Sequence, residues 1–229
     1  MNSSGGPSAG QIIRQRRSLV ACDGRTSIPA ERFYRMLERV MPRVERDVAR
    51  RPMPWDAIPW DPAIHFGLFV HRVEGTLKHS MHSHFDWAVP PCCPGSLPLY
   101  LLERGDARQL ATQLSCRQDI AGEGAFSRGM IAEYREKLLA HGASFYRRLF
   151  REAGAIGQVL YLEAEAAGVR STGIGCFFDD PVHEVFGFKD LAFQSLYHFT
   201  DGGAVDDPRL TTLPPYGRRA ATARPRIST

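Results

Sequence analysis

Residues 144–167 constrain the fold more than any other part of the chain. Apolar residues recur in this segment at spacings of three and four, and Gly168 follows it directly. Such spacing predicts an amphipathic helix, and glycine is the residue that most often ends a helix in the left-handed conformation. A chain of 229 residues forms one or at most two domains. We therefore expect a single core built around one central buried helix.

Shorter elements surround this helix in a mixed order. Helices are predicted at residues 9–17, from Ser27 as N-cap to about Arg50 with an interruption at Pro42, at 107–114, and at 179–186 with an aspartate cap. Strands are predicted at residues 64–73, 99–102 and 193–203. Residues 125–134 fit either a strand or a helix, and residues 171–177 either a strand or a turn. Because strands and helices do not alternate as in βαβ units, the sequence predicts an α+β class.

Three further expectations concern the termini, the location and the partners. The domain is predicted over residues 10–216, between a disordered N-terminus at 1–9 and a disordered basic tail at 217–229. The chain lacks the roughly 18 consecutive apolar residues of a membrane span and begins without an apolar signal region, so we expect a cytoplasmic protein. The formal charge of +4 is spread along the chain, whereas a nucleic-acid footprint gathers charge on one face. We therefore expect neither a membrane nor a nucleic acid as partner.

The basic residues and the cysteines carry further information. Nearly all the basic residues are arginine, the side chain that suits bidentate contacts with phosphate. The cysteines show no spacing typical of a disulfide framework, so reduced thiols are expected at all five positions: Cys22, Cys92, Cys93, Cys116 and Cys176.

Three segments, in this order, resemble one family. They are Arg16-Arg17-Ser18 after the first helix, GQVLYLEAEAAGVRSTGIGCFFD at residues 157–179, and LYHFTDGGAVDDPRL at residues 196–210. Together they look like the nitroreductase superfamily, and most like its SagB-type branch, which includes dehydrogenases that oxidise azoline rings in peptides. The resemblance covers roughly residues 9–28 and 115–216. It implies a nitroreductase-like fold, with a central and mostly antiparallel sheet flanked by helices, and a flavin mononucleotide (FMN) site completed by a second subunit.

The resemblance also implies which residues bind FMN. Arg16 and Ser18 match the family's phosphate and ribityl contacts, Arg17 matches a polar position beside them, and Arg209 matches the C-terminal phosphate arginine. A phosphate dianion needs such fixed cations and hydroxyl groups. Alternatively, Arg16 and Arg17 lie at a solvated helix end, and Arg209 lies at an exposed surface position.

A second group of residues would contact the flavin ring. The loop Gly173-Ile174-Gly175-Cys176 matches the one whose backbone N–H groups face flavin N5, where glycine permits close approach of the main chain. A simple glycine-rich turn is the alternative. Gln158 matches a polar position near the flavin, although a glutamine satisfied by its own helix fits the residue equally well.

The resemblance implies an FMN-dependent oxidoreductase. Hydride or electrons would pass through flavin N5 between NAD(P)H or an organic substrate and a nitro, quinone, azoline or oxygen acceptor. The substrate would be a small molecule or a peptide, and the chain would act as a homodimer or pair with a related domain. No catalytic acid or base is assigned. The chain lacks the Lys-Tyr pair of azoline-oxidising members, and residues 75–98 are shortened against relatives.

Three other interpretations of the chain remain. The chain could be a non-catalytic scaffold, or half of a pseudo-dimer with a degenerate flavin site. Histidines and cysteines at His79, His82, His84, Cys92 and Cys93 are of the metal-ligand types, but their spacing matches no zinc pattern, so we expect no metal. Cys176 could be a nucleophile, although a buried and inert thiol is the stronger expectation.

Overall fold

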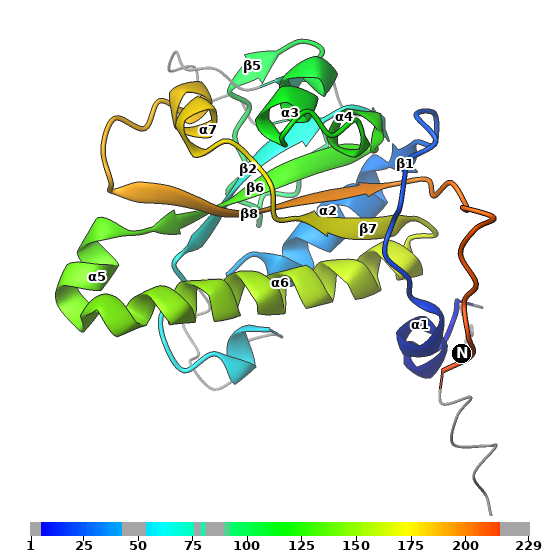
Figure 1. Ribbon diagram of the computed structural model, residues 1–229, viewed down its shortest axis with the longest axis horizontal. Coiled ribbons are helices and arrows are strands. Elements are labelled where there is room, and N and C mark those ends of the chain that lie inside the picture. The colour runs from blue at the N-terminus through cyan, green and yellow to red at the C-terminus, as the bar shows by residue number, and fades with distance from the viewer. Residues whose placement is uncertain (1–5, 43–53, 76–78, 81–89, 91, 216–229) are drawn as a thin grey trace, which may run out of the picture.

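A central antiparallel sheet organises the computed structural model, which describes residues 6–42, 54–75, 79–80, 90 and 92–215 (Figure 1). Within these ranges the sheet has six strands in the order β5-β4-β2-β6-β8-β7. Their bounds are β5 Glu103–Arg104, β4 His79–Ser80, β2 Ile64–Val70, β6 Phe126–Glu133, β8 Phe193–Gly202 and β7 Arg170–Ile174. A short parallel pair joins β1 (Ile28–Pro29) to β3 (Val73–Glu74). The predicted α+β class with a mostly antiparallel sheet is confirmed.

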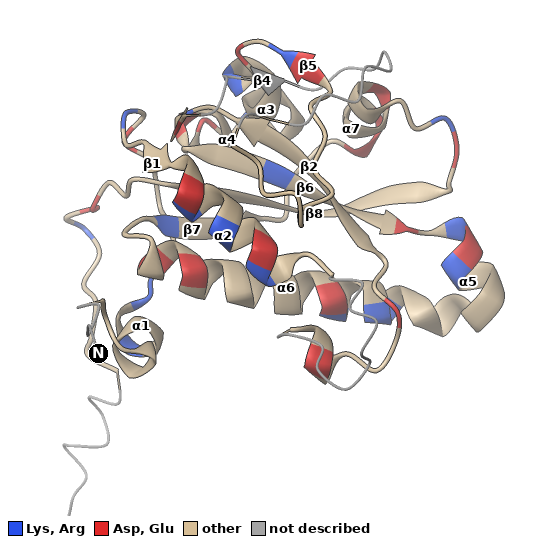
Figure 2. Cartoon of the chain, turned by 180° about the vertical axis from the view of Figure 1, so that it is seen from behind, with Lys and Arg blue, Asp and Glu red and all other residues tan. Residues whose placement is uncertain are grey.

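Helices cover both faces of the sheet (Figure 1). The long helix α6 (Tyr146–Ala166) and α2 (Ala30–Val40) pack on one face, and the other face carries α3 (Arg108–Leu114), α4 (Ile120–Glu123) and α7 (Asp179–Phe186). Helix α1 (Ala9–Gln15) lies against α6, and α5 (Arg135–His141) follows β6. Two 3-10 turns span Trp55–Ala57 and Ala143–Phe145. Basic and acidic residues are interspersed along α2 and α6 (Figure 2).

Helix α6 confirms the prediction of a central helix. Leu149, Ile156 and Leu160 lie on its buried face, against Met130 of β6 and Phe199 of β8. The helix ends at Ala166, and Gly168 adopts the expected positive φ of 78°. Burial of this apolar face is the main source of its stability, since propensity alone holds few helices together in water.

The ends of four elements differ from the predictions. Helix α2 has Pro29 as its N-cap, because the Ser27 hydroxyl instead donates to Glu74 Oε1 (2.5 Å). The helix ends at Val40, and the part predicted beyond residue 42 lies outside the described residues. Phe178 is the N-cap of α7, so the aspartates at 179 and 180 lie in the first turn of the helix. Their negative charges there stabilise the helix by interacting with its dipole. The strand predicted at 99–102 is found at 103–104. Helix α1 begins at the predicted Ala9, where Ser8 and Gln11 form a capping box, but it ends at Gln15 rather than at residue 17.

The expectation of five reduced thiols is wrong. Cys116, after α3, forms a disulfide with Cys176, after β7, across 60 positions of sequence and with a Cα–Cα distance of 5.8 Å. Cys176 is therefore exposed and bonded rather than a buried thiol. Cys22 is a free and buried thiol whose pKa burial raises to about 12. The pairing could not be predicted because it depends on how two distant loops meet, not on local spacing.

Two remaining observations concern membranes and metals. No helix in the described part of the chain is long and apolar enough to cross a membrane. Those same residues contain no group of three metal-binding side chains. His82 and His84 lie outside them, as does most of the segment 75–98.

Candidate functional site

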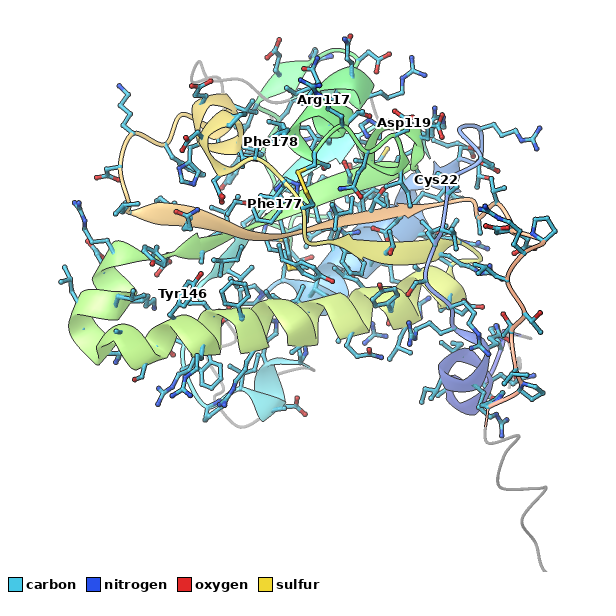
Figure 3. All side chains as sticks on the ribbon, viewed as in Figure 1. Cys22, Arg117, Asp119, Tyr146, Phe177 and Phe178 are labelled. Carbon is cyan, nitrogen blue, oxygen red and sulfur yellow. A yellow bond between two sulfur atoms is a disulfide. The ribbon has the colours of Figure 1, made fainter. Side chains whose placement is uncertain are left out.

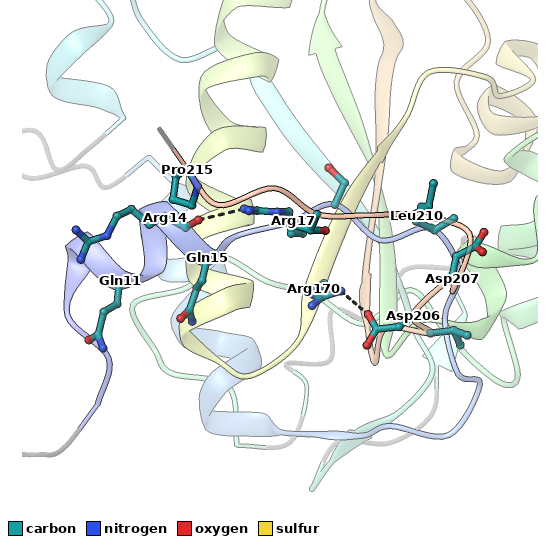
Figure 4. Close-up of a pocket in the computed structure, with 13 residues that line it drawn as sticks. Gln11, Arg14, Gln15, Arg17, Arg170, Asp206, Asp207, Leu210 and Pro215 are labelled. Carbon is teal, nitrogen blue, oxygen red and sulfur yellow. Dashed lines mark hydrogen bonds and ion pairs between the residues drawn. The ribbon is translucent and has the colours of Figure 1, made fainter. Parts of the chain in front are cut away.

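A pocket of about 780 Å³ opens where α1, the start of β7 and the C-terminal segment meet (Figure 4). We call it the α1 pocket. Arg14, Arg17 and Ser18 line it from the N-terminal segment, and Arg170 lines it from β7. The carboxylates of Asp206 and Asp207 lie on its C-terminal side. Its volume lies in the usual range for small-molecule and cofactor sites.

The charges of the pocket are held in place by local hydrogen bonds. Arg17 Nη1 donates to the carbonyl oxygens of Arg16 (2.7 Å) and Arg14 (3.1 Å), so its guanidinium is fixed at the C-terminal end of α1. Arg170 Nη1 donates to Asp206 Oδ1 (3.1 Å). The cationic side of the pocket is therefore built by residues from α1 and β7.

Tyr161 of α6 connects the N-terminal segment to β7. Its hydroxyl oxygen accepts hydrogen bonds from Ser18 Oγ (3.3 Å) and from the backbone N–H of Gly173 (3.1 Å). Its ring lies beneath the guanidinium of Arg16, 4.7 Å from the ring centroid, and packs edge-on against Phe199 at 5.0 Å. Sequence reasoning missed this role, because the spacing of Tyr161 marked only an apolar position on the central helix.

The four residues predicted to face the flavin ring divide into two pairs. Gly173 and Ile174 belong to β7, and the N–H of Gly173 is already bonded to Tyr161. A Cβ added at Gly173 would collide with the hydroxyl of Tyr197, so this glycine accommodates a side chain of the same protein. Gly175 and Cys176 follow the strand in an exposed turn, and a Cβ at Gly175 would meet nothing within 4 Å.

The other predicted residues do not line the pocket, although Asp207, the partner of Arg209, does. The guanidinium of Arg209 makes a bidentate contact with Asp207 (Nε–Oδ1 2.9 Å and Nη2–Oδ2 2.7 Å), and its side chain is 87% exposed. That contact holds the pKa of the Asp207 carboxyl below its usual value. Gln158 is exposed on α6. The structure thus brings Arg17 and Ser18 to the pocket, stacks Arg16 on Tyr161 beside it, and leaves Arg209 and Gln158 outside.

Several buried polar groups of the sheet contact one another rather than the pocket. Arg128 of β6 and Asp201 of β8 form a fully buried ion pair, and the Ser171 hydroxyl donates to the same carboxylate. His198 is buried between Ser115 and Ser195, and burial lowers its pKa to about 4. None of these groups lines the α1 pocket, so none is placed to act there as an acid or a base.

Comparison with known proteins gives matches of structure alone. No family model matches the chain, and no curated protein matches it at a significant level. A candidate nitroreductase of Anabaena variabilis superposes with a TM-score of 0.65 at 22% identity, covering 83% of this chain and 37% of its own. The present chain therefore spans much less than half of that protein.

Two further structures extend the comparison. A chain of the Escherichia coli microcin synthetase McbBCD complex gives a TM-score of 0.62 at 17% identity, covering 90% of this chain and 76% of its own. The NADPH:FMN oxidoreductase of Vibrio harveyi gives a TM-score of 0.55 at 11% identity, and the match covers 96% of this chain and 78% of the oxidoreductase chain. With an antiparallel sheet between two helical layers and the long α6 across one face, this chain has the nitroreductase fold.

Proposed function

We propose that the chain is an FMN-dependent oxidoreductase. One observation carries the proposal. The α1 pocket unites Arg17 and Ser18, which the family resemblance assigns to FMN, with Arg14 and Arg170, which it does not. Arg170 is a further cation that β7 contributes at this point, and the N-terminal motif alone does not require it.

The donor set of the pocket fits a phosphate group. Guanidinium groups and a hydroxyl are the side chains that bind a phosphate dianion best. The two carboxylates nearby are each paired inside the chain, Asp206 with Arg170 and Asp207 with Arg209. They therefore oppose an anion less than free carboxylates would. Arg170 has to share its charge between Asp206 and the phosphate.

Strand β7 leads from the phosphate end of the proposed site to its flavin end. Four residue steps from Arg170 to Ile174 cover roughly 13 Å, at about 3.3 Å per residue. The exposed turn at Gly175 and Cys176 follows. The backbone N–H groups of that turn would face N5 of the flavin, whereas Gly173 contacts Tyr161 and leaves room for the hydroxyl of Tyr197.

The protein's part in the reaction would be binding and orientation. Bound FMN supplies a centre that accepts and returns hydride at N5. Arg17, Ser18 and Arg170 would hold its phosphate. Tyr161 would keep the N-terminal segment next to β7 through its hydrogen bonds with Ser18 and Gly173. The proposed reductant is NAD(P)H or an organic substrate, and the acceptor a nitro, quinone, azoline or oxygen group. Peptide substrates are supported by the similar McbBCD structure, which has truncated pro-MccB17 bound.

We also propose a homodimer in the cytoplasm. The outer face of α6 carries Tyr146 and Phe150, which are 40% and 44% exposed, and then Gly154, beside which the surface is open. Two aromatic side chains one turn apart, followed by a glycine, suit close packing against a second helix. Sedimentation velocity measures the oligomeric state directly.

Titration of the purified protein with FMN tests the proposed site. Arg17→Ala should raise the Kd for FMN about tenfold or more, because a charged hydrogen bond is worth about 1.5–3 kcal/mol. Arg209→Ala tests whether the guanidinium of Arg209 breaks its contact with Asp207 and binds the FMN phosphate instead. Its matched control is Arg108→Ala, since Arg108 makes the same bidentate contact with Asp106 two residues before it.

The outcomes separate the proposal from its alternative. A yellow protein with weakened FMN binding in Arg17→Ala and unchanged binding in Arg108→Ala supports the oxidoreductase. A colourless protein that does not take up FMN supports the non-catalytic scaffold or half of a pseudo-dimer. The pairing of Arg209 with Asp207 is the observation that favours this alternative.

A further inference from the structure

The disulfide joins the segment between α3 and α4 to the segment that follows β7. Cys116 belongs to the turn between α3 and α4, and Cys176 belongs to the turn that follows β7 (Figure 3). Cys176 is exposed and Cys116 is half-buried, so the bond joins a residue at the surface to one partly below it. The turn after β7 is also the one that carries Gly175, at the proposed flavin end of the site.

The turn that holds Cys116 has an uncommon backbone. Cys116 and Arg117 are consecutive non-glycine residues with positive φ values of 54° and 59°. Such residues persist where the surrounding structure holds them, and they gather at functional sites and switch regions. The covalent bond to Cys176 is one of the constraints that hold this turn.

Noncovalent contacts hold the two turns together as well. The backbone N–H of Phe178 donates to Leu114 O (2.9 Å), and Gln118 Nε2 donates to Cys176 O (3.1 Å). The ring of Phe177 stacks on His198, with centroids 4.4 Å apart. Because these contacts do not need the sulfur–sulfur bond, they would preserve the fold after its loss. Reduction would remove only the covalent restraint on Cys116 and Cys176, which leaves the backbone at Gly175 and Cys176 more free to move.

We propose that Cys116 and Cys176 form a reversible thiol–disulfide site whose redox state sets the position of the Gly175–Cys176 turn. The reductant is an external dithiol. One of its thiolates attacks a sulfur of the pair, giving a mixed disulfide and releasing one cysteine thiolate. Its second thiolate then displaces the other cysteine. The pair gains two electrons and two protons, and the dithiol becomes a disulfide. The effect on flavin binding rests on the proposed function, whereas the thiol chemistry does not.

The remaining cysteines provide internal controls. Cys22 is buried with a strongly raised pKa, so it should resist alkylation until the protein unfolds. Cys92 is exposed and Cys93 is half-buried, and both are free and lie in a different segment. A change confined to Cys116 and Cys176 is therefore recognisable by peptide mapping.

Differential alkylation of the full chain tests the thiol site. We expect dithiothreitol, without denaturant, to expose two new alkylation sites together, at Cys116 and Cys176, while the circular dichroism spectrum stays native. Cys22 should remain unmodified. Two outcomes overturn the site: thiols at both positions in the air-oxidised protein, or reduction only after unfolding.

FMN titration of the oxidised and reduced protein tests the coupling to the turn. We expect the Kd for FMN to differ about fivefold or more between the two states. Cys116→Ser should reproduce the reduced value and lose its response to dithiothreitol, while Cys92→Ser should keep that response. Equal affinities in both states overturn the coupling. Absence of FMN binding in both states overturns the proposed function instead, and the alkylation result still decides the thiol site.

Discussion

A single hydroxyl group, that of Tyr161, joins two parts of the chain that lie far apart in sequence. It accepts from Ser18 and from the N–H of Gly173. Deleting it by Tyr161→Phe keeps the ring contacts with Arg16 and Phe199 but leaves that N–H without its acceptor. We expect the free energy of unfolding to fall by about 1 kcal/mol, measured by urea denaturation, and FMN affinity to fall with it. Tyr146→Phe is the control, because it removes the same hydroxyl from a 40% exposed tyrosine at the other end of α6. Equal effects of the two variants would contradict the role given to Tyr161.

The two glycines of the predicted flavin loop should respond differently to alanine. At Gly173 a methyl group would displace the Tyr197 hydroxyl, so Gly173→Ala should lower the free energy of unfolding by about 1–3 kcal/mol. At Gly175 the space is open, so Gly175→Ala should leave the melting of the FMN-free protein nearly unchanged. If the flavin approaches this turn, the same variant weakens FMN binding. A Gly175→Ala protein with normal FMN affinity would remove the turn from the site.

The strand β6 shows why sequence patterns left some elements open. Seven of its eight residues are buried, because helices cover both faces of the sheet and β2 and β8 flank its edges. A strand buried on both faces loses the alternation of polar and apolar residues by which strands are recognised. Helix α6 keeps a polar side, and its pattern therefore predicted it well.

The disulfide contributes to stability through the loop that it closes. For the 60-residue separation between Cys116 and Cys176, restriction of the unfolded chain predicts a contribution of about 4 kcal/mol. The double variant Cys116→Ser with Cys176→Ser should lose that much free energy of unfolding in urea under oxidising conditions. In dithiothreitol the variant and the parent should converge. A difference that persists in dithiothreitol would mean that the serines disturb the fold directly.

Two buried histidines make the stability of the whole molecule depend on pH. Burial lowers the pKa of His71 and of His198 to about 4, from 6.5 for an ordinary histidine. Between these values the unfolded chain binds more protons than the folded one. Stability from this source is complete above pH 6.5 and is lost as the pH falls towards 4, by a few kcal/mol in total.

Urea denaturation at a series of pH values measures this dependence. His198→Gln should give a shallower loss of stability between pH 6.5 and 4 than the parent protein. His65→Gln, at a half-exposed position, is the control. The Asp23 carboxyl does not interfere with this measurement. Hydrogen bonds from Thr26 and Arg25 outweigh its partial burial and lower its pKa to about 2. Its contribution to stability is therefore lost only below pH 3.8, outside the range between pH 6.5 and 4. An unchanged slope in His198→Gln would contradict the assignment.

The sequence by itself determined the features that depend on neighbours along the chain. The three- and four-residue spacing predicted α6, and Gly168 predicted where that helix ends. The Arg16-Arg17-Ser18 motif predicted the N-terminal side of the candidate site. Only the tertiary structure decided which distant groups meet. It joined Cys116 to Cys176, brought Arg170 to the same pocket as Arg17, and placed Tyr161 between Ser18 and Gly173. The physical reason is that residue spacing sets local dihedral angles and the apolar face of an element. Contacts between elements depend instead on strand pairing and on the side chains that share each buried space.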